Sequence, residues 1–204
     1  GDETAFSRFF TRSRERRGLD ALSKGMLAIA QGDGKTALKK AKIAEKYLKR
    51  PALTRLLNAQ AAELAGDTAR AETYYKALMT DDQTAFVGAQ GLLGHAMAQN
   101  DTDRALKLAE HSHELLPKNA QAMETLYTLQ SQKFDWKAAR KTLVEQKKRG
   151  LLPKEDAVKR EAALVYAQAE DAERVGETEH ARKLAVEAAK LDPSNVNAAI
   201  GAAR

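Results

Sequence analysis

Histidine and acidic residues are the side chains of this chain that could support catalysis or ligand binding. A metal site requires ligands that converge, for example from positions i and i+4 of a helix, with support from carboxylates. His111 and His113 lie two residues apart, so on a helix they point in different directions. We therefore expect no metal site and no resident cofactor among the four histidines, which are His95, His111, His113 and His180.

No spacing in the sequence assembles a nucleophile, a base and a group that orients the base. Acidic pairs such as Asp81-Asp82 and Glu170-Asp171 are typical of solvated helix faces and caps. The chain has no cysteine, which excludes thiolate catalysis and Cys-ligated metals in this segment. The sequence therefore predicts a protein that is not an enzyme.

A short phrase that recurs every 34 residues indicates which elements position these side chains. Each copy has a turn residue, then an acidic residue, then an alanine four positions later. The copies are Gly32-Asp33 with Ala37, Gly66-Asp67 with Ala71, Asn100-Asp101 with Ala105, Phe134-Asp135 with Ala139, and, after 42 residues, Gly176-Glu177 with Ala181. A period of about 34 residues is that of tetratricopeptide repeats, in which two antiparallel helices form each unit. The alanine is explained by the close approach of those two helices.

Apolar side chains at three- and four-residue steps predict one helix on each side of every turn. The first pair is marked by Leu19, Leu22 and Met26 before the turn and by Ala37 and Ala41 after it. The other expected pairs are 52–65 with 68–80, 84–99 with 102–116, 120–132 with 136–149, and 155–175 with 178–191. The predicted fold is an all-α solenoid of about five repeats plus the start of a sixth, without strands.

The fifth copy is delayed by eight residues, and the excess falls around residues 150–156. Its Gly and Pro content predicts a longer loop and a lengthened following helix. A change in the path of the superhelix is the alternative.

Positive charge is concentrated at the start of the chain. Residues 1–50 carry 13 Lys and Arg against 6 Asp and Glu, whereas the remaining repeats are nearly neutral. This distribution does not favour nucleic-acid binding.

We divide the chain into a basic and aromatic segment, 1–17, and a repeat domain, 18–204. The composition of the first segment is consistent with two alternatives, a stretch that lies beside a membrane and a solvated helix extension. Its membrane-proximal candidates are Phe6, Arg8, Phe9, Phe10, Arg12, Arg14, Arg16 and Arg17.

Several runs resemble the HemY-type tetratricopeptide proteins of α-proteobacteria. They are residues 16–25 (RRGLDALSKG), residues 56–67 (LLNAQAAELAGD), Gly91-Leu92-Leu93, Asp135-Trp136, and Lys190-Leu191-Asp192-Pro193 followed by Ala198-Ala199. The resemblance implies a protein associated with haem biosynthesis and anchored in the bacterial inner membrane by N-terminal spans. It also implies that the repeat domain lies on the cytoplasmic face. No stretch of this chain has the roughly 20 apolar residues that a span needs, so the segment itself is expected to be soluble.

These features favour a membrane-tethered scaffold that binds other proteins, most directly the enzymes of tetrapyrrole synthesis. The first helix of each repeat lines the concave face of such a superhelix. The expected partner-binding residues are Gln60, Glu63, Gln90, Met97, Glu124, Thr128, Tyr166 and Glu170. They include no Lys or Arg cluster that could hold a peptide carboxylate, so a chaperone-tail receptor is not expected.

Two alternatives remain open. The domain could bind haem or porphyrin directly, with His95 or His111 as axial ligand and Tyr127 or Tyr166 as substitutes. It could also be a general assembly module for cell-envelope complexes, because a solenoid serves both roles.

Overall fold

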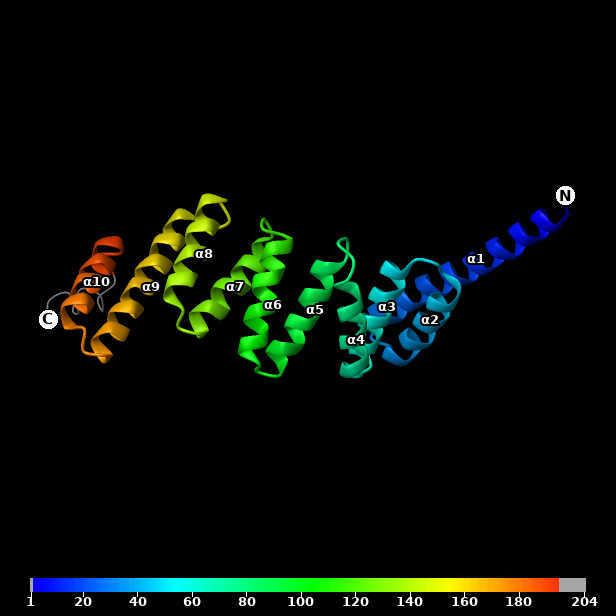
Figure 1. The fold of residues 1–204 in the computed structure, drawn as a ribbon, viewed down its shortest axis with the longest axis horizontal. Helices are drawn as coiled ribbons and strands as arrows, with labels where there is room; N and C mark the ends of the chain where they lie inside the picture. Colours follow the sequence, from blue (N-terminus) through cyan, green and yellow to red (C-terminus); the bar gives the residue numbers. More distant parts are fainter. Residues whose placement is uncertain (1, 195–204) are drawn as a thin grey trace. The chain divides into compact units, whose positions relative to one another are not determined.

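The computed structural model describes residues 2–194, which form ten α-helices and contain no strand. This confirms the all-α prediction, and the antiparallel helix pairs are visible in Figure 1. The start of a sixth repeat, which was expected at the end of the chain, lies outside the described residues. The helices are α1 (Asp2–Ala30), α2 (Gly34–Tyr47), α3 (Pro51–Leu64), α4 (Thr68–Leu78), α5 (Ala85–Ala98), α6 (Thr102–Leu115), α7 (Ala120–Gln132), α8 (Trp136–Lys148), α9 (Lys154–Arg174) and α10 (Thr178–Leu191).

The chain forms two compact units, Gly1–Leu108 and Ala109–Arg204, with the boundary inside α6. In the first unit each helix from α1 to α5 packs against the next, and α1 also contacts α3. In the second unit the same succession holds from α7 to α10. Contacts between consecutive helices are consistent with an α-solenoid of helix pairs.

The recurring phrase forms the turn between the two helices of each repeat. Its first residue has a positive φ in all five copies: 76° at Gly32, 76° at Gly66, 57° at Asn100, 59° at Phe134 and 85° at Gly176. The amide after it bonds to a carbonyl five residues back, as in the 2.8 Å bond from Asp67 N to Ala62 O. Such a left-handed residue with a closing bond ends a helix, and glycine adopts it without a steric penalty.

The acidic residue of the phrase begins the second helix of the pair. The Asp33 carboxylate accepts the amide of Thr36 at 3.0 Å, and Asp67 accepts that of Arg70 at 3.1 Å. Asp101 and Asp135 make the equivalent bonds. These are N-cap bonds, which satisfy an amide that has no partner inside the helix. Glu177, in the fifth copy, makes no such bond.

The alanine of the phrase is buried in every copy. Ala37, Ala71, Ala105 and Ala139 have no exposed surface, and Ala181 is nearly as buried. Ala37, Ala71 and Ala139 belong to small cores between successive helices, built largely of alanine and leucine. The 34-residue period therefore places one small side chain at each close approach.

The eight extra residues of the fifth repeat all lie within α9. This helix has 21 residues, whereas α7, the first helix of the preceding repeat, has 13. The lengthened helix was expected, but the loop before it, residues 149–153, is only one residue longer than residues 116–119, the loop before α7. The insertion therefore adds helical turns rather than loop.

The first helix runs without interruption from Asp2 to Ala30, so no break separates residues 1–17 from the repeat that follows. Its N-terminal part extends past α2, and residues 4–17 are exposed (Figure 1). Gly18, the first buried residue, lies against Leu48, and a Cβ at this glycine would be 2.9 Å from the Leu48 backbone nitrogen. Glycine at this point allows α1 to approach the end of α2 closely.

Candidate functional site

A cluster of polar side chains joins three helices of the first unit. Glu63 projects from α3, Tyr75 from α4 and His95 from α5. The Tyr75 hydroxyl donates a 2.6 Å hydrogen bond to the Glu63 carboxylate, and His95 Nε2 lies 3.4 Å from the other oxygen of that carboxylate. Glu63, an expected partner-binding residue, is thus linked to both α4 and α5.

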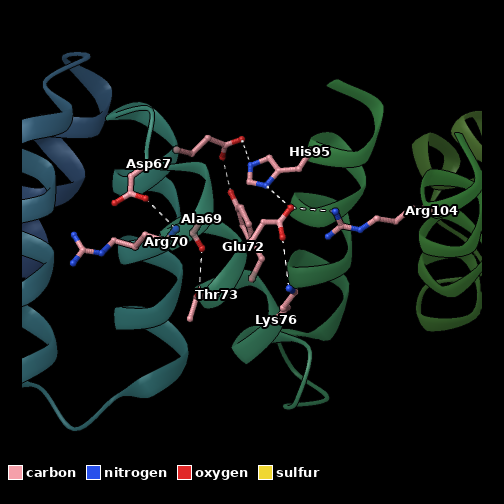
Figure 2. Close-up of polar contacts among 10 residues, drawn as sticks. Asp67, Ala69, Arg70, Glu72, Thr73, Lys76, His95 and Arg104 are labelled. Atoms are coloured by element: carbon pink, nitrogen blue, oxygen red, sulfur yellow. Dashed lines mark hydrogen bonds and ion pairs between the residues drawn. The ribbon is translucent and has the colours of Figure 1, made fainter. Parts of the chain in front are cut away.

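Glu72 of α4 extends the cluster on the other side of the histidine (Figure 2). Its carboxylate accepts a 3.1 Å hydrogen bond from the Arg104 guanidinium and lies 3.9 Å from His95 Nδ1. Lys76, one turn further along α4, is 3.6 Å away. The hydrogen bond from Arg104 lowers the pKa of Glu72, so the carboxylate stays charged at neutral pH.

The Tyr75 ring is held by its hydroxyl bond and by two residues of α5. Burial, and then the bond to Glu63, raise the pKa of Tyr75 well above its usual range, so the hydroxyl remains a donor. One side of the ring lies against Gly91 of α5, where a Cβ would come within 2.4 Å of the ring carbons. The ring also meets His95 edge-on, with centroids 5.6 Å apart. This packing fixes the geometry of the cluster.

His95 lies between two carboxylates and is only 8 % exposed. An axial haem ligand needs a ring nitrogen that faces an open position, and the surroundings of His95 offer none. His111, on α6, belongs to the second unit and is partly buried, and its Nδ1 lies 3.6 Å from the Glu114 carboxylate. Tyr127 is partly buried under the Arg160 guanidinium, and Tyr166 packs against the core of the last repeat. Their roles as haem ligands remain predictions.

A second polar cluster lies in the second unit, around Glu124 of α7. The Arg160 guanidinium bonds both oxygens of this carboxylate, at 2.9 and 2.8 Å, and the Gln146 amide donates at 3.0 Å. The bonds from Arg160 lower the pKa of Glu124. Three helices, α7, α8 and α9, are joined in this way. Sequence analysis missed Arg160 and Gln146 because neither belongs to the recurring phrase.

The eight expected partner-binding residues fall into three groups. Glu63 and Glu124 are engaged in the two clusters. Gln90 and Tyr166 are partly buried, and the Gln90 amide nitrogen is enclosed without a hydrogen-bond partner among the described residues. The exposed members are Gln60, Met97, Thr128 and Glu170. Gln60 and Met97 lie in the first unit and the other two in the second, so each unit presents part of the expected surface.

An exposed apolar row accompanies Gln60 and Met97 on the first helices of the first unit. Leu19, Leu53 and Val87 occupy the same position of α1, α3 and α5, one period apart, and are 41, 43 and 38 % exposed. Leu64 is also exposed on α3. We name these six residues the first-helix face. The 34-residue spacing of the row could be predicted from the sequence. The exposure of its side chains could not, because it depends on how the helices pack.

All eight membrane-proximal candidates are exposed on α1. The rings of Phe6 and Phe10 contact each other, with centroids 4.6 Å apart. Across the described residues, no helix combines the length and the apolar character needed to cross a membrane. Nor do His, Asp and Glu side chains of residues 2–194 gather in a group that could hold a metal ion.

A comparison with known protein families agrees with the N-terminal resemblance. Residues 3–66 match the family model described as the HemY protein N-terminus. No curated protein matches the chain in a sequence search. Among solved structures, a thermophilic TPR protein of Thermus thermophilus is similar at 16 % identity and a TM-score of 0.46, over 90 % of this chain and 95 % of that one. The match over residues 3–66, on helix pairs that follow a 34-residue period, supports a HemY-type, tetratricopeptide-like helical protein.

Proposed function

We propose that this chain is a non-enzymatic scaffold, tethered to the bacterial inner membrane, that holds enzymes of haem biosynthesis on the cytoplasmic side. The observation that carries the proposal is the first-helix face, which begins on α1 and α3, within the residues that match the HemY N-terminus, and continues on α5. Exposed apolar side chains beside uncharged polar ones have the composition of a protein-binding surface. The first polar cluster supports this surface because it joins α3 and α5, two of the helices that carry it, through α4.

The tether rests on the composition of α1 and on the family match. Arginines together with Phe6, Phe9 and Phe10 suit the interface of a membrane whose lipids are anionic. The resemblance to HemY proteins, which implies N-terminal membrane spans, supports the tether. A helix that continues from residue 2 into the first repeat would hold the repeats at a fixed distance from the bilayer.

A pair of matched variants tests the scaffold. Gln60→Arg with Met97→Arg places two charges on the first-helix face, where both side chains are exposed. Lys39→Glu with Lys42→Glu changes two exposed residues of α2 and serves as the control. Tetrapyrrole-synthesis enzymes should co-purify from bacterial membranes with the wild type and the control but not with the face variant. Co-purification of these enzymes with all three proteins would refute the proposal for this face.

Direct haem binding is the alternative, and a haem titration distinguishes it from the scaffold. The buried, carboxylate-flanked His95 leads us to expect no saturable Soret shift that depends on this residue. A one-to-one shift that His95→Ala or His111→Ala weakens would favour porphyrin handling. A general cell-envelope assembly role would instead appear as co-purification of envelope proteins without tetrapyrrole enzymes.

A further inference from the structure

A cleft lies between the N-terminal half of α1 and the end of α2. Its volume is about 440 Å³, and it is formed where Gly18 allows Leu48 to approach α1. The side chains that line it come from both helices and from the connection to α3. They are Thr11, Arg14, Glu15, Lys46, Tyr47, Lys49 and Arg50. None of them belongs to the first-helix face, so the inference does not depend on protein binding at that face, although Arg14 is also one of the membrane-proximal residues.

The cleft carries an excess of positive charge. Four of its side chains are cationic, and the one acid, Glu15, lies 3.5 Å from Arg50. A fifth cation, Arg17, covers the Tyr47 ring at 4.5 Å from the guanidinium carbon to the ring centroid. Arg14 and Lys46 also face this ring, at 5.8 and 5.5 Å. Among the side chains that the structure describes, no carboxylate lies within ion-pair distance of Arg14, Arg17, Lys46 or Lys49.

Local stability does not account for this arrangement. A cation in the last turn of α2 is favoured by the helix dipole, which explains Lys46 alone. Each contact with the Tyr47 ring contributes about 0.5–1 kcal/mol at an exposed site. Arg14, however, comes from a different helix, and Lys49 and Arg50 follow the end of α2. Like charges brought together from three segments repel one another, and a bound anion would remove that repulsion.

The donors fit a phosphate group better than a carboxylate. Guanidinium groups bond phosphate oxygens in pairs, and ammonium groups act as point charges beside them. A phosphate monoester carries about −1.5 to −2 charges at neutral pH, which would offset at least half of the positive charge that four cations and one acid give the cleft. The volume leaves room for part of the molecule to which the phosphate is attached.

We propose that the cleft between α1 and the end of α2 binds a phosphate-bearing ligand through Arg14, Lys46, Lys49 and Arg50. The phosphate has two possible sources, a soluble phosphate compound or the headgroup of an anionic phospholipid. Sequence analysis found Arg14 as a membrane-proximal residue but not the three α2-side cations, because only the packing at Gly18 brings them to it.

The test uses the full 204-residue chain and two probes. Pyrophosphate is titrated by calorimetry, and vesicles of phosphatidylglycerol in phosphatidylcholine are tested by co-sedimentation, with and without pyrophosphate as competitor. The cleft variant is Lys46→Gln with Lys49→Gln. The control is Lys39→Gln with Lys42→Gln, which removes the same charge from exposed positions of α2 outside the cleft. Circular dichroism at 222 nm confirms that both variants remain helical.

The wild type and the control should bind, and the cleft variant should bind about tenfold or more weakly because two charge-assisted bonds are lost. Saturable pyrophosphate binding without vesicle binding identifies a soluble ligand. Vesicle binding that pyrophosphate displaces identifies a lipid headgroup. The proposal is overturned if neither probe binds, or if the two variants weaken binding equally. It is also overturned if only the vesicles bind and pyrophosphate does not displace them.

Discussion

Two glycines of α5 offer a direct test of the packing that fixes the first polar cluster. At Gly91 an added Cβ would lie 2.4 Å from Tyr75 Cδ1 and Cε1, whereas at Gly94 it would meet nothing within 4 Å. Carbon atoms in favourable contact are about 3.5–4.0 Å apart, so Gly91→Ala must displace the ring by more than 1 Å. Tyr75 is 5 % exposed and its hydroxyl is bonded to Glu63, so it has little room to move.

The two substitutions share one favourable term and differ in one unfavourable term. Alanine is about 1 kcal/mol more favourable than glycine inside a helix, and this gain applies to both positions. Overpacking of a buried site costs about 1–3 kcal/mol and applies only to Gly91. We therefore expect Gly94→Ala to stabilise the protein by up to about 1 kcal/mol. Gly91→Ala should be less stable than Gly94→Ala by about 1–3 kcal/mol.

Urea unfolding followed by circular dichroism at 222 nm measures both variants against the wild type. The helix-propensity term cancels in their difference, so the difference reports the contact between Gly91 and the Tyr75 ring alone. Equal free energies of unfolding for the two variants would show that the ring does not rest on Gly91. The reasoning about the cluster would then be wrong as well, because that contact helps to orient the Tyr75 hydroxyl toward Glu63.

The remaining predictions concern the turns and the second cluster. Asp67→Ala should cost about 1 kcal/mol of unfolding free energy because the N-cap bond is lost. Glu177→Ala, at the copy without this bond, should change the unfolding free energy by less than about 0.5 kcal/mol. Thermal unfolding measures both variants, and equal losses would contradict the capping argument. The pKa of Glu124 lies below its usual 4.5 in the folded protein because of Arg160, so its stabilising contribution is present above pH 4.5 and is lost as the pH falls through the lowered value. The wild type should therefore exceed Glu124→Gln in unfolding free energy by less at about pH 3 than at about pH 7. Unfolding is followed by the fluorescence of Trp136, the one tryptophan of the chain. A difference in unfolding free energy that does not change with pH would rule out this linkage.

The repeat period was sufficient to predict the helix pairs, because each copy of the phrase specifies a turn chemically. Gly66 supplies a positive φ, Asp67 caps the following helix, and Ala71 permits the close approach. Phe134 adopts the same left-handed conformation at φ 59°, although a bulky residue disfavours it. The position in the repeat therefore outweighed the local preference of that residue.

Side-chain partners could not be predicted in the same way. Whether Glu63 faces solvent or Tyr75 depends on rotamers and on the contact at Gly91, neither of which has a signature in the sequence. The burial of His95 between two carboxylates likewise has no signature in the sequence, where this residue was a candidate haem ligand by type alone. The periodic spacing identified which helices adjoin each other, and packing determined which atoms meet.

Photo-crosslinking from the first-helix face tests the scaffold most directly, because it reports contact rather than co-purification. A photoreactive amino acid replaces Gln60 in the full-length protein in its own bacterium, and a second strain carries it at Lys39 of α2; both positions are exposed. The account predicts light-dependent adducts with tetrapyrrole-synthesis enzymes from position 60 and not from position 39. Adducts with these enzymes at neither position, or equally at both, would contradict the claim that this face holds them.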